Sequence, residues 1–301
     1  MRLRAIFFLL AGTMTLLVPG GCAPNQAGEV GGGSPSMSSP ELRQAWNVIR
    51  GAQSRRLERL STFSSSGQLT MRWQEDGRNR WEQADARIWW SMPGRMALRL
   101  SRVGSRLAMA GWNNDVWWVF DEMSDDTTLS IFPVDLLGQG EDRLMSPPLL
   151  LALAGLIEFP TDPPADFETL DDGVFGFTVS NLRLGAGGRS GMAMGLNAYV
   201  ELDRSGPRRM ELRGPAGEVV AMSDLDDRRS VECRGVAQGA WPVLAYQIRA
   251  SMPGAAGVDS RVTVSIDRPL AGGSVPERVF DLEAVRSSVQ PKVVIDQRGD
   301  G

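Results

Sequence analysis

Apolar and polar residues alternate with a period of two along most of the chain after residue 67. This alternation is typical of β-strands with one buried face. It is strict in residues 196–202, where Leu196, Ala198, Val200 and Leu202 would lie on one side. The segments form two groups, and we expect about 11 strands in all. Because a sheet of that size usually curls or closes, the pattern predicts a mainly β (α+β) fold built on a single, strongly curved antiparallel sheet.

Helical signals precede the first group of strands. Ser38 and Glu41 can form a capping box, and Pro40 suits the first turn of a helix. Apolar residues then recur near helical spacing from Leu42 to Leu60, and arginines occupy the opposite face. We predict an N-terminal helix that packs on the sheet, and the sequence leaves open which surface it covers.

A second helix is predicted between the two groups of strands. Ser146 can cap it and Pro147 can begin it. The following segment, Leu149–Leu156, is apolar on all sides. A short helix of that composition is expected to be buried or to cover an apolar surface.

Residues 1–21 have the layout of a secretory signal. Arg2 and Arg4 precede an uncharged run, residues 5–18, that is shorter than the roughly 20 residues of a spanning helix. Pro19 and two glycines end the run, and Cys22 follows. The small residue before Cys22 resembles a bacterial lipobox, which implies that the Cys22 thiol is acylated and the chain is cut before it. An ordinary signal peptide cut nearby, with Cys22 a bystander, stays open.

A tether and one domain follow the signal. Residues 22–40 comprise the lipidated cysteine and a flexible Gly-, Ser- and Pro-rich linker, and residues 41–298 form the domain. The 16 residues at positions 23–38 would reach about 20–24 Å as a coil. Since the mature chain is mildly acidic, lipid on Cys22 is the expected link to the membrane. Ala23 lies where an inner-membrane retention Asp can occur, which favours the outer membrane, on the periplasmic side.

The amino-acid composition argues against several classes of function. The chain has no His, which removes the usual general base near neutral pH and the commonest metal ligand. Two Cys cannot form a Cys-rich zinc site, and we interpret Cys233 as a packing residue. The net charge is −4 and the charges alternate, so nothing favours nucleic-acid binding. We expect no enzyme activity, no catalytic residue, no metal and no cofactor, and an enzyme stays the third alternative.

Adjacent tryptophans indicate aromatic side chains on both faces of the sheet. Trp89 with Trp90, and Trp117 with Trp118, would each place one indole on either face. One face can be core, and the other needs cover from the helices, a ligand or a partner. If the helices leave part of it uncovered, an apolar cavity would bind apolar ligands.

The order of these parts resembles the bacterial lipoprotein-carrier family of LolA and LolB over residues 41–296. Three stretches carry the resemblance, and they are ARIWWSMPGRMALRL, NNDVWWVFD and VPERVFDLEAVRSSVQPKVVID. The third resembles the LolA ending, a Phe-centred strand followed by Pro and a last short strand. The resemblance implies a half-open β-barrel with a helical lid that receives acyl chains.

Two departures from the family pattern affect this interpretation. Met92 stands where LolA-type carriers have an Arg that latches the lid, and a thioether cannot donate those hydrogen bonds. The anchor at Cys22 is LolB-like, but the hairpin that corresponds to the protruding LolB loop is short and offers only Val103. Because a stable anchor and a short tether would fix the domain to the membrane, a receptor or sensor is favoured over a shuttle.

The first hypothesis is a membrane-anchored lipoprotein that binds acyl chains or lipoproteins. The second is a non-catalytic structural or regulatory envelope lipoprotein that acts through a protein partner. The predicted cavity lining, chosen by strand alternation, is Leu69, Met71, Ile88, Trp90, Met96, Leu98, Met109 and Trp118. The predicted lid residues are Leu149, Leu150 and Leu153.

Overall fold

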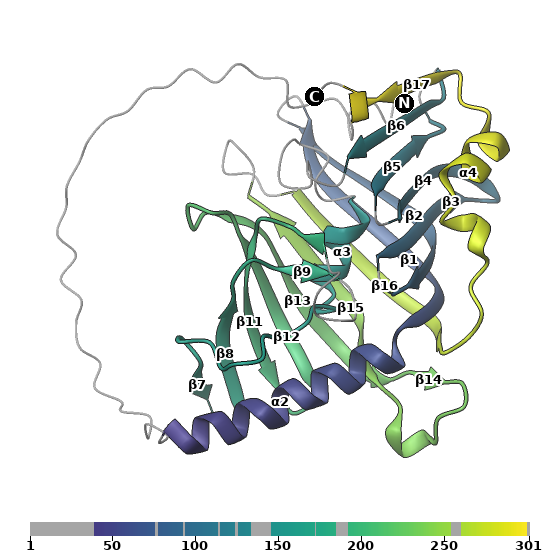
Figure 1. Cartoon of the computed structure of the whole chain (residues 1–301). Helices are drawn as coiled ribbons and strands as arrows, with labels where there is room; N and C mark the ends of the chain where they lie inside the picture. Colours follow the sequence, from purple (N-terminus) through teal and green to yellow (C-terminus); the bar gives the residue numbers. More distant parts are fainter. Residues whose placement is uncertain are drawn as a thin grey trace, which may run out of the picture.

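The computed structural model describes residues 39–299 except 76–77, 93, 114, 124–125, 134–145, 172, 185–191 and 254–259. The described chain is mostly β, with one curved sheet and three α-helices (Figure 1). None of these helices combines the length and the apolar character that crossing a membrane requires. The predicted signal, Ser38 and Cys22 lie outside the described residues.

Fifteen of the described strands belong to one sheet. Its order is β17-β6-β5-β4-β3-β2-β1-β16-β15-β13-β12-β11-β8-β7, and β14 pairs with β16. The bounds in the first half are β1 (Thr62–Glu75), β2 (Arg78–Ser91), β3 (Arg95–Arg102), β4 (Ser105–Asn113), β5 (Val116–Asp121), β6 (Thr128–Pro133) and β7 (Glu168–Asp171). The others are β8 (Val174–Val179), β11 (Asn197–Asp203), β12 (Gly206–Arg213), β13 (Val219–Ser230), β14 (Glu232–Cys233), β15 (Val243–Met252), β16 (Ser260–Ala271) and β17 (Val293–Asp296).

The prediction of about 11 strands was therefore too low. The strands that alternation missed in this sheet, β7 and β14, have four and two residues, which is too short for a period to show. A separate pair, β9 (Arg183–Leu184) and β10 (Met192–Ala193), is equally short. The curved antiparallel architecture itself is confirmed: neighbours on the main path pair antiparallel, and β17 with β6 is the parallel exception.

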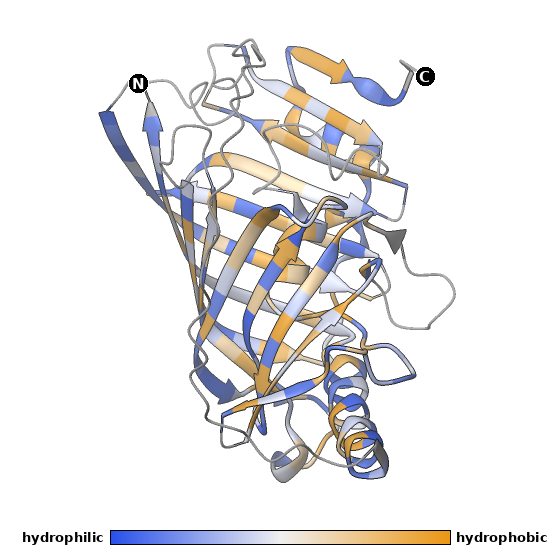
Figure 2. Ribbon diagram, turned by 90° about the vertical axis from the view of Figure 1, so that its left-hand side faces the viewer, coloured by the Kyte–Doolittle hydropathy of each residue, from blue (hydrophilic) through white to orange (hydrophobic). Residues whose placement is uncertain are grey.

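The sheet joins the two predicted groups of strands at its centre. β1 pairs with β16 from Phe63 opposite Ala271 to Arg72 opposite Arg261. The alternation of hydropathy follows the strands on both sides of this seam (Figure 2). Residues of the concave face form the main core, and a helix lies inside the curve.

Helix α2 (Ser39–Arg59) runs across one end of the sheet (Figure 1). Trp46 of this helix is fully buried against the sheet. Its ring centroid lies 4.9 Å from that of Phe177 and 5.9 Å from that of Phe159. The Trp46 indole N–H donates to the Pro160 carbonyl at 3.2 Å. The predicted N-terminal helix is thus confirmed, and the surface it covers is this end of the sheet.

Helix α3 (Pro147–Leu153) is the predicted second helix, but it is shorter than expected. It stops before Gly155, whose φ of +70° leaves the helical region, so the expected run to residue 156 was wrong. Ser146 occupies the cap position, but its hydroxyl makes no capping hydrogen bond.

Helix α4 (Leu282–Val289) covers the outer, convex face of β4–β6 and was not predicted. Its residues Leu282, Val285 and Val289 pack with Trp118 and Phe120. The Phe-centred strand expected near the C-terminus is wrong: this segment forms a 3-10 turn (Glu277–Val279) and α4, which Asp281 caps by accepting from two backbone N–H groups. The last short strand, β17, is confirmed. Two further 3-10 turns span Gln238–Ala240 and Gln297–Gly299.

Candidate functional site

Helix α3 fills the concave face of the sheet. It contacts β3 and β4 on one side of the seam and β12 and β13 on the other. Between α3 and the sheet remains an apolar cavity of about 40 Å³. Its lining is Leu69, Ile88, Trp90, Met96, Leu98, Leu150, Leu151, Leu153, Ala154, Leu244, Ile248, Ala250, Val262, Val264 and Ile266. Since sites for small molecules usually measure about 300–1,000 Å³, an acyl chain does not fit there while α3 is in place.

Five of the eight predicted lining residues surround this cavity. They are Leu69, Ile88, Trp90, Met96 and Leu98. Met71 is buried in the same core cluster but does not line the cavity. The rings of Trp90 and Phe63 stack with centroids 3.6 Å apart, and the Trp90 N–H donates to the Leu60 carbonyl at 2.6 Å.

Met109 and Trp118 lie on the opposite face, so their assignment to the concave lining was wrong. Both belong to the cluster under α4. On β4 the concave positions are Ala108, Ala110 and Trp112. Alternation separates the two faces of a strand but does not say which one is concave. The helix that covers Met109 and Trp118 had not been predicted, so these two residues were assigned to the inner face. Trp117, next in sequence to Trp118, does lie in the concave core, as the adjacent-pair argument predicted.

The predicted lid residues all lie on α3. Leu149 and Leu153 are buried, and Leu150 is half-buried. Leu150 and Leu153 line the cavity. The lid is thus an apolar helix packed inside the curved sheet.

Three side chains, which we call the latch residues, hold the C-terminal end of α3: Gln53, Arg56 and Ser223. Gln53 Nε2 donates to the carbonyls of Gly155 at 3.0 Å and Ile157 at 2.8 Å. Ser223 Oγ donates to the Leu153 carbonyl at 2.5 Å. Backbone carbonyls at a helix end have no partner within the helix, so these donors stabilise this end of α3.

Arg56 is the charged member of the latch. Its Nη1 donates to the Gly155 carbonyl at 2.9 Å and to Gln53 Oε1 at 3.2 Å, and its Nε donates to the Val243 carbonyl at 2.8 Å. Its side chain is buried, and burial, with the nearby Arg228 charge, lowers the pKa of the Arg56 guanidinium to about 10. Arg56 is therefore a cation at neutral pH whose acceptors are all neutral.

Met92, at the position of the family latch, supplies no side-chain donor. Its backbone N–H donates to the Ser61 carbonyl at 2.7 Å, and its half-buried side chain packs against the core. The donors to the α3 end come instead from α2 and β13. Sequence reasoning missed them, although Gln53 and Arg56 lie one helical turn apart on α2.

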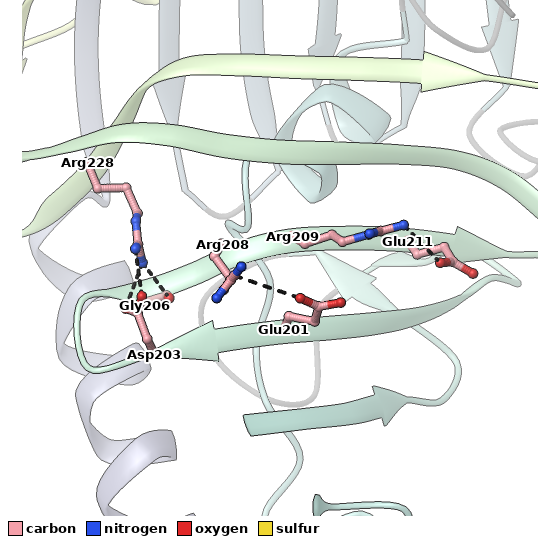
Figure 3. Close-up of polar contacts among 7 residues, drawn as sticks. All are labelled: Glu201, Asp203, Gly206, Arg208, Arg209, Glu211 and Arg228. Atoms are coloured by element: carbon pink, nitrogen blue, oxygen red, sulfur yellow. Dashed lines mark hydrogen bonds and ion pairs between the residues drawn. The ribbon is translucent and has the colours of Figure 1, made fainter. Parts of the chain in front are cut away.

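Figure 3 shows an ion pair between Arg228 and Asp203 at the turn between β11 and β12. Arg228 is also near enough to Arg56 to lower the pKa of Arg56. Arg228 Nη1 donates to Asp203 Oδ1 at 2.7 Å and Nη2 to Oδ2 at 2.6 Å, and Nη1 also donates to the Gly206 carbonyl at 3.2 Å. Burial acts to raise the pKa of the Asp203 carboxyl, but hydrogen bonds from Arg228 and the Ser205 N–H outweigh it and lower the pKa. The charge of Asp203 is thus matched by Arg228 and does not compensate Arg56.

Within the described residues no cluster of His, Cys, Asp or Glu could hold a metal ion. Cys233 is a buried free thiol whose Sγ lies 3.5 Å from the Arg59 carbonyl, so its interpretation as a packing residue is confirmed. Neither observation tests whether the chain has catalytic activity.

Comparison with known proteins gives a likeness of fold. No protein-family model matches the sequence, and no curated protein matches it. A domain classed as an outer-membrane lipoprotein-sorting protein from Vibrio parahaemolyticus superposes with a TM-score of 0.50 at 9% identity, covering 80% of this chain and 99% of that chain. The fold is LolA-like.

Two further solved structures superpose with the LolA-like sheet at lower scores. A LolA superfamily protein from Nitrosomonas europaea gives a TM-score of 0.46 at 10% identity, covering 78% of this chain and 98% of that one. A DUF1329 family protein from Desulfovibrio piger gives 0.49 at 10% identity, covering 79% and 98%. At these identities the likeness does not extend to ligands.

Proposed function

We propose that this chain is a non-catalytic lipoprotein of the periplasm whose concave face binds acyl chains of lipids or lipoproteins. The main support for this proposal is helix α3. It is apolar throughout, it lies where an apolar ligand would lie, and polar side chains hold its C-terminal end. Such a helix can leave as a unit when an acyl chain replaces its contacts.

Displacement of α3 is required because the cavity of about 40 Å³ is too small for a lipid tail. Removing the helix would expose a continuous apolar wall that includes Trp90, Leu98 and Ile266. Leaving such a wall in water is unfavourable by about 25 cal/mol per Å². An acyl chain would cover it, whereas a polar ligand would not.

The anchor and the location belong to the same proposal. Cys22 carries the lipid, residues 22–40 tether the domain 41–298, and the outer membrane holds it on the periplasmic side. The lipobox-like stretch at residues 19–22 and the LolA-like fold support this.

The filled interior favours a second candidate, a structural or regulatory envelope lipoprotein that acts through a protein partner. β17 offers one surface for it, because this strand ends the sheet and its Val293, Val294 and Ile295 are each more than a third exposed. An exposed sheet edge can pair with an extended segment of another chain.

Native mass spectrometry on the exported chain with Cys22→Ser separates the two. The chain is mixed with a triacylated lipopeptide and, in parallel, with the same peptide without acyl chains. A 1:1 complex with the acylated peptide alone is expected. Absence of any complex would contradict acyl binding and favour the second candidate.

A further inference from the structure

A groove of about 740 Å³ runs between α2, the β11–β12 turn and residues 241–243. Its volume lies within the usual range for sites that bind small molecules. None of the residues that line it also lines the cavity under α3. It is therefore a separate cavity. It shares a wall with the latch, because Gln53 and Arg56 also line it, but the proposed acyl site on the concave face does not include it.

One half of the groove is mainly apolar, with Glu41 and Gln44 as its polar members. The walls there include Val48, Ile49, Phe159 and Phe175. Val48 is 66% exposed and, with Ile49 and the two phenylalanines, forms an apolar surface that solvent can reach. The ring contact between Trp46 and Phe159 places this half near the N-terminal part of α2.

The other half is basic. Arg55, Arg56 and Arg59 from the last turns of α2, and Arg204 from the β11–β12 turn, line it. Arg55 and Arg59 are four residues apart and so lie on one face of the helix. Within the described part of the chain, Arg55, Arg59 and Arg204 have no ion-pair partner.

Arg56 lies at the inner wall of this basic half. Three of its hydrogen bonds use Nε and Nη1, and no described residue accepts from Nη2. The carboxylates that line the groove are Asp203, which Arg228 engages through both oxygens, and Glu41. Glu41 is fifteen residues from Arg56 on the same helix, or about 22 Å along its axis. The groove thus has positive charge that its own residues do not neutralise.

We infer that the groove binds an anionic acyl lipid, with a carboxylate or phosphate head at the arginines and an acyl chain along Val48, Ile49 and Phe159. Guanidinium groups form charge-assisted, bidentate hydrogen bonds with either head group. Val48 and Arg55 are seven residues apart, about 10 Å along the helix, so head and chain lie on one continuous path.

Binding is measured by isothermal titration of the exported Cys22→Ser chain with oleate and with lysophosphatidylglycerol. Oleyl alcohol and lysophosphatidylcholine provide the same chains without net negative charge, and inorganic phosphate provides the head alone. Both anionic lipids are expected to bind at least tenfold more tightly than the other three ligands.

Variants locate the ligand. The double variant Arg55→Gln/Arg59→Gln should weaken both anionic lipids about tenfold or more and leave the neutral lipids unchanged. Val48→Asp should weaken every lipid with a chain. Arg43→Gln, on the same helix but outside the groove, is the matched control and should bind like the parent.

Three outcomes would overturn the inference. Unchanged affinity in the double variant would mean that the lipid binds elsewhere, for example under α3. Equal affinity for oleate and oleyl alcohol would mean that the arginines do not select the head. Phosphate binding as tightly as lysophosphatidylglycerol would mean that the apolar half contributes nothing. Lipopeptide binding at the concave face is tested separately, by native mass spectrometry with the acylated and unacylated peptides, so failure of this inference and failure of the proposed function are distinguishable.

Discussion

Arg56 is a buried cation that joins three parts of the chain far apart in sequence. It contacts the end of α3 through Gly155, the start of β15 through Val243 and its own helix through Gln53. A buried donor of this kind is expensive to remove, because the carbonyls it served are left without partners. Its effect on stability should therefore exceed that of any exposed arginine on α2.

Replacing Arg56 with Met tests this. The change keeps much of the side-chain volume but removes three hydrogen bonds, so we expect the free energy of unfolding to fall by about 1–3 kcal/mol. Urea denaturation measures the loss. Arg43→Met, an exposed position on the same helix, should change stability by less than about 0.5 kcal/mol. Equal stability of the Arg56→Met variant and the parent would show that the hydrogen bonds of Arg56 contribute nothing to stability.

The Asp203–Arg228 pair makes stability depend on pH. Since the pKa of Asp203 in the folded chain lies below its ordinary value of 3.8, the unfolded chain binds more protons near and below that pH. The pair's contribution is present above pH 3.8 and is lost as the pH falls through the folded pKa. Asp203→Asn should flatten the fall in unfolding free energy between about pH 4 and pH 2.

Chemical denaturation at several pH values measures this slope. Asp162→Asn, at an exposed aspartate outside the pair, serves as the control and should keep the parent's slope. A slope for Asp203→Asn as steep as the parent's would assign the acid sensitivity to other carboxylates.

Helices α3 and α4 show, at the scale of elements, what the sequence could and could not predict. α3 could be predicted because its run of leucines has no polar residue to place in water. α4 has eight residues with apolar positions at Leu282, Val285 and Val289, and its segment was instead interpreted as a strand ending. Because α4 was not predicted, no element was expected to cover the outer face of the sheet at Trp118 and Met109. These two residues were therefore wrongly assigned to the inner face.

The latch could not be predicted for a different reason. Gln53, Arg56 and Ser223 act on carbonyls about 70 to 100 residues away in sequence. Every residue has a backbone carbonyl, so the sequence does not show which carbonyls accept these hydrogen bonds. Only the folded structure shows which donor and acceptor lie close together. By contrast, Leu69, Ile88 and Leu98 lie in the middle of regular strands and were placed correctly by alternation alone.

Filling the small cavity should hold α3 more firmly. Val264→Ile adds one methylene at the cavity lining, which we expect to raise the free energy of unfolding by up to about 1 kcal/mol. Hydrogen exchange of the amides in residues 149–153 should slow, and lipopeptide binding should weaken, because α3 becomes harder to displace. Val294→Ile, at an exposed position on β17, is the control. Faster exchange in α3 would mean that the cavity cannot accept the added group.

The whole molecule combines an open curved sheet with a predicted anchor at one end of the chain. The architecture followed from the period-two pattern, whereas the number of strands did not, because the shortest pairings carry no pattern. α2 begins at Ser39, two residues before the predicted end of the tether (22–40) and directly after the predicted coil of residues 23–38, which would reach about 20–24 Å. The groove along α2 would then lie within reach of the membrane surface that supplies acyl lipids.

Cys22→Ser tests the anchor. The thiol is the proposed site of acylation, and the mildly acidic chain offers no second attraction to anionic lipids. We expect the variant to leave the membrane fraction and appear in the soluble periplasmic fraction, while Cys233→Ser, the other cysteine, stays with the membranes. Retention of the Cys22→Ser variant in membranes would contradict the anchor.

Exchange of α3 for an acyl chain is tested most directly by hydrogen–deuterium exchange of residues 147–157 with and without the triacylated lipopeptide. If acyl chains replace α3, its amides should exchange markedly faster in the complex, and the peptide without acyl chains should have no effect. A bound lipopeptide that leaves α3 as protected as in the free chain would contradict displacement of α3 from the concave face.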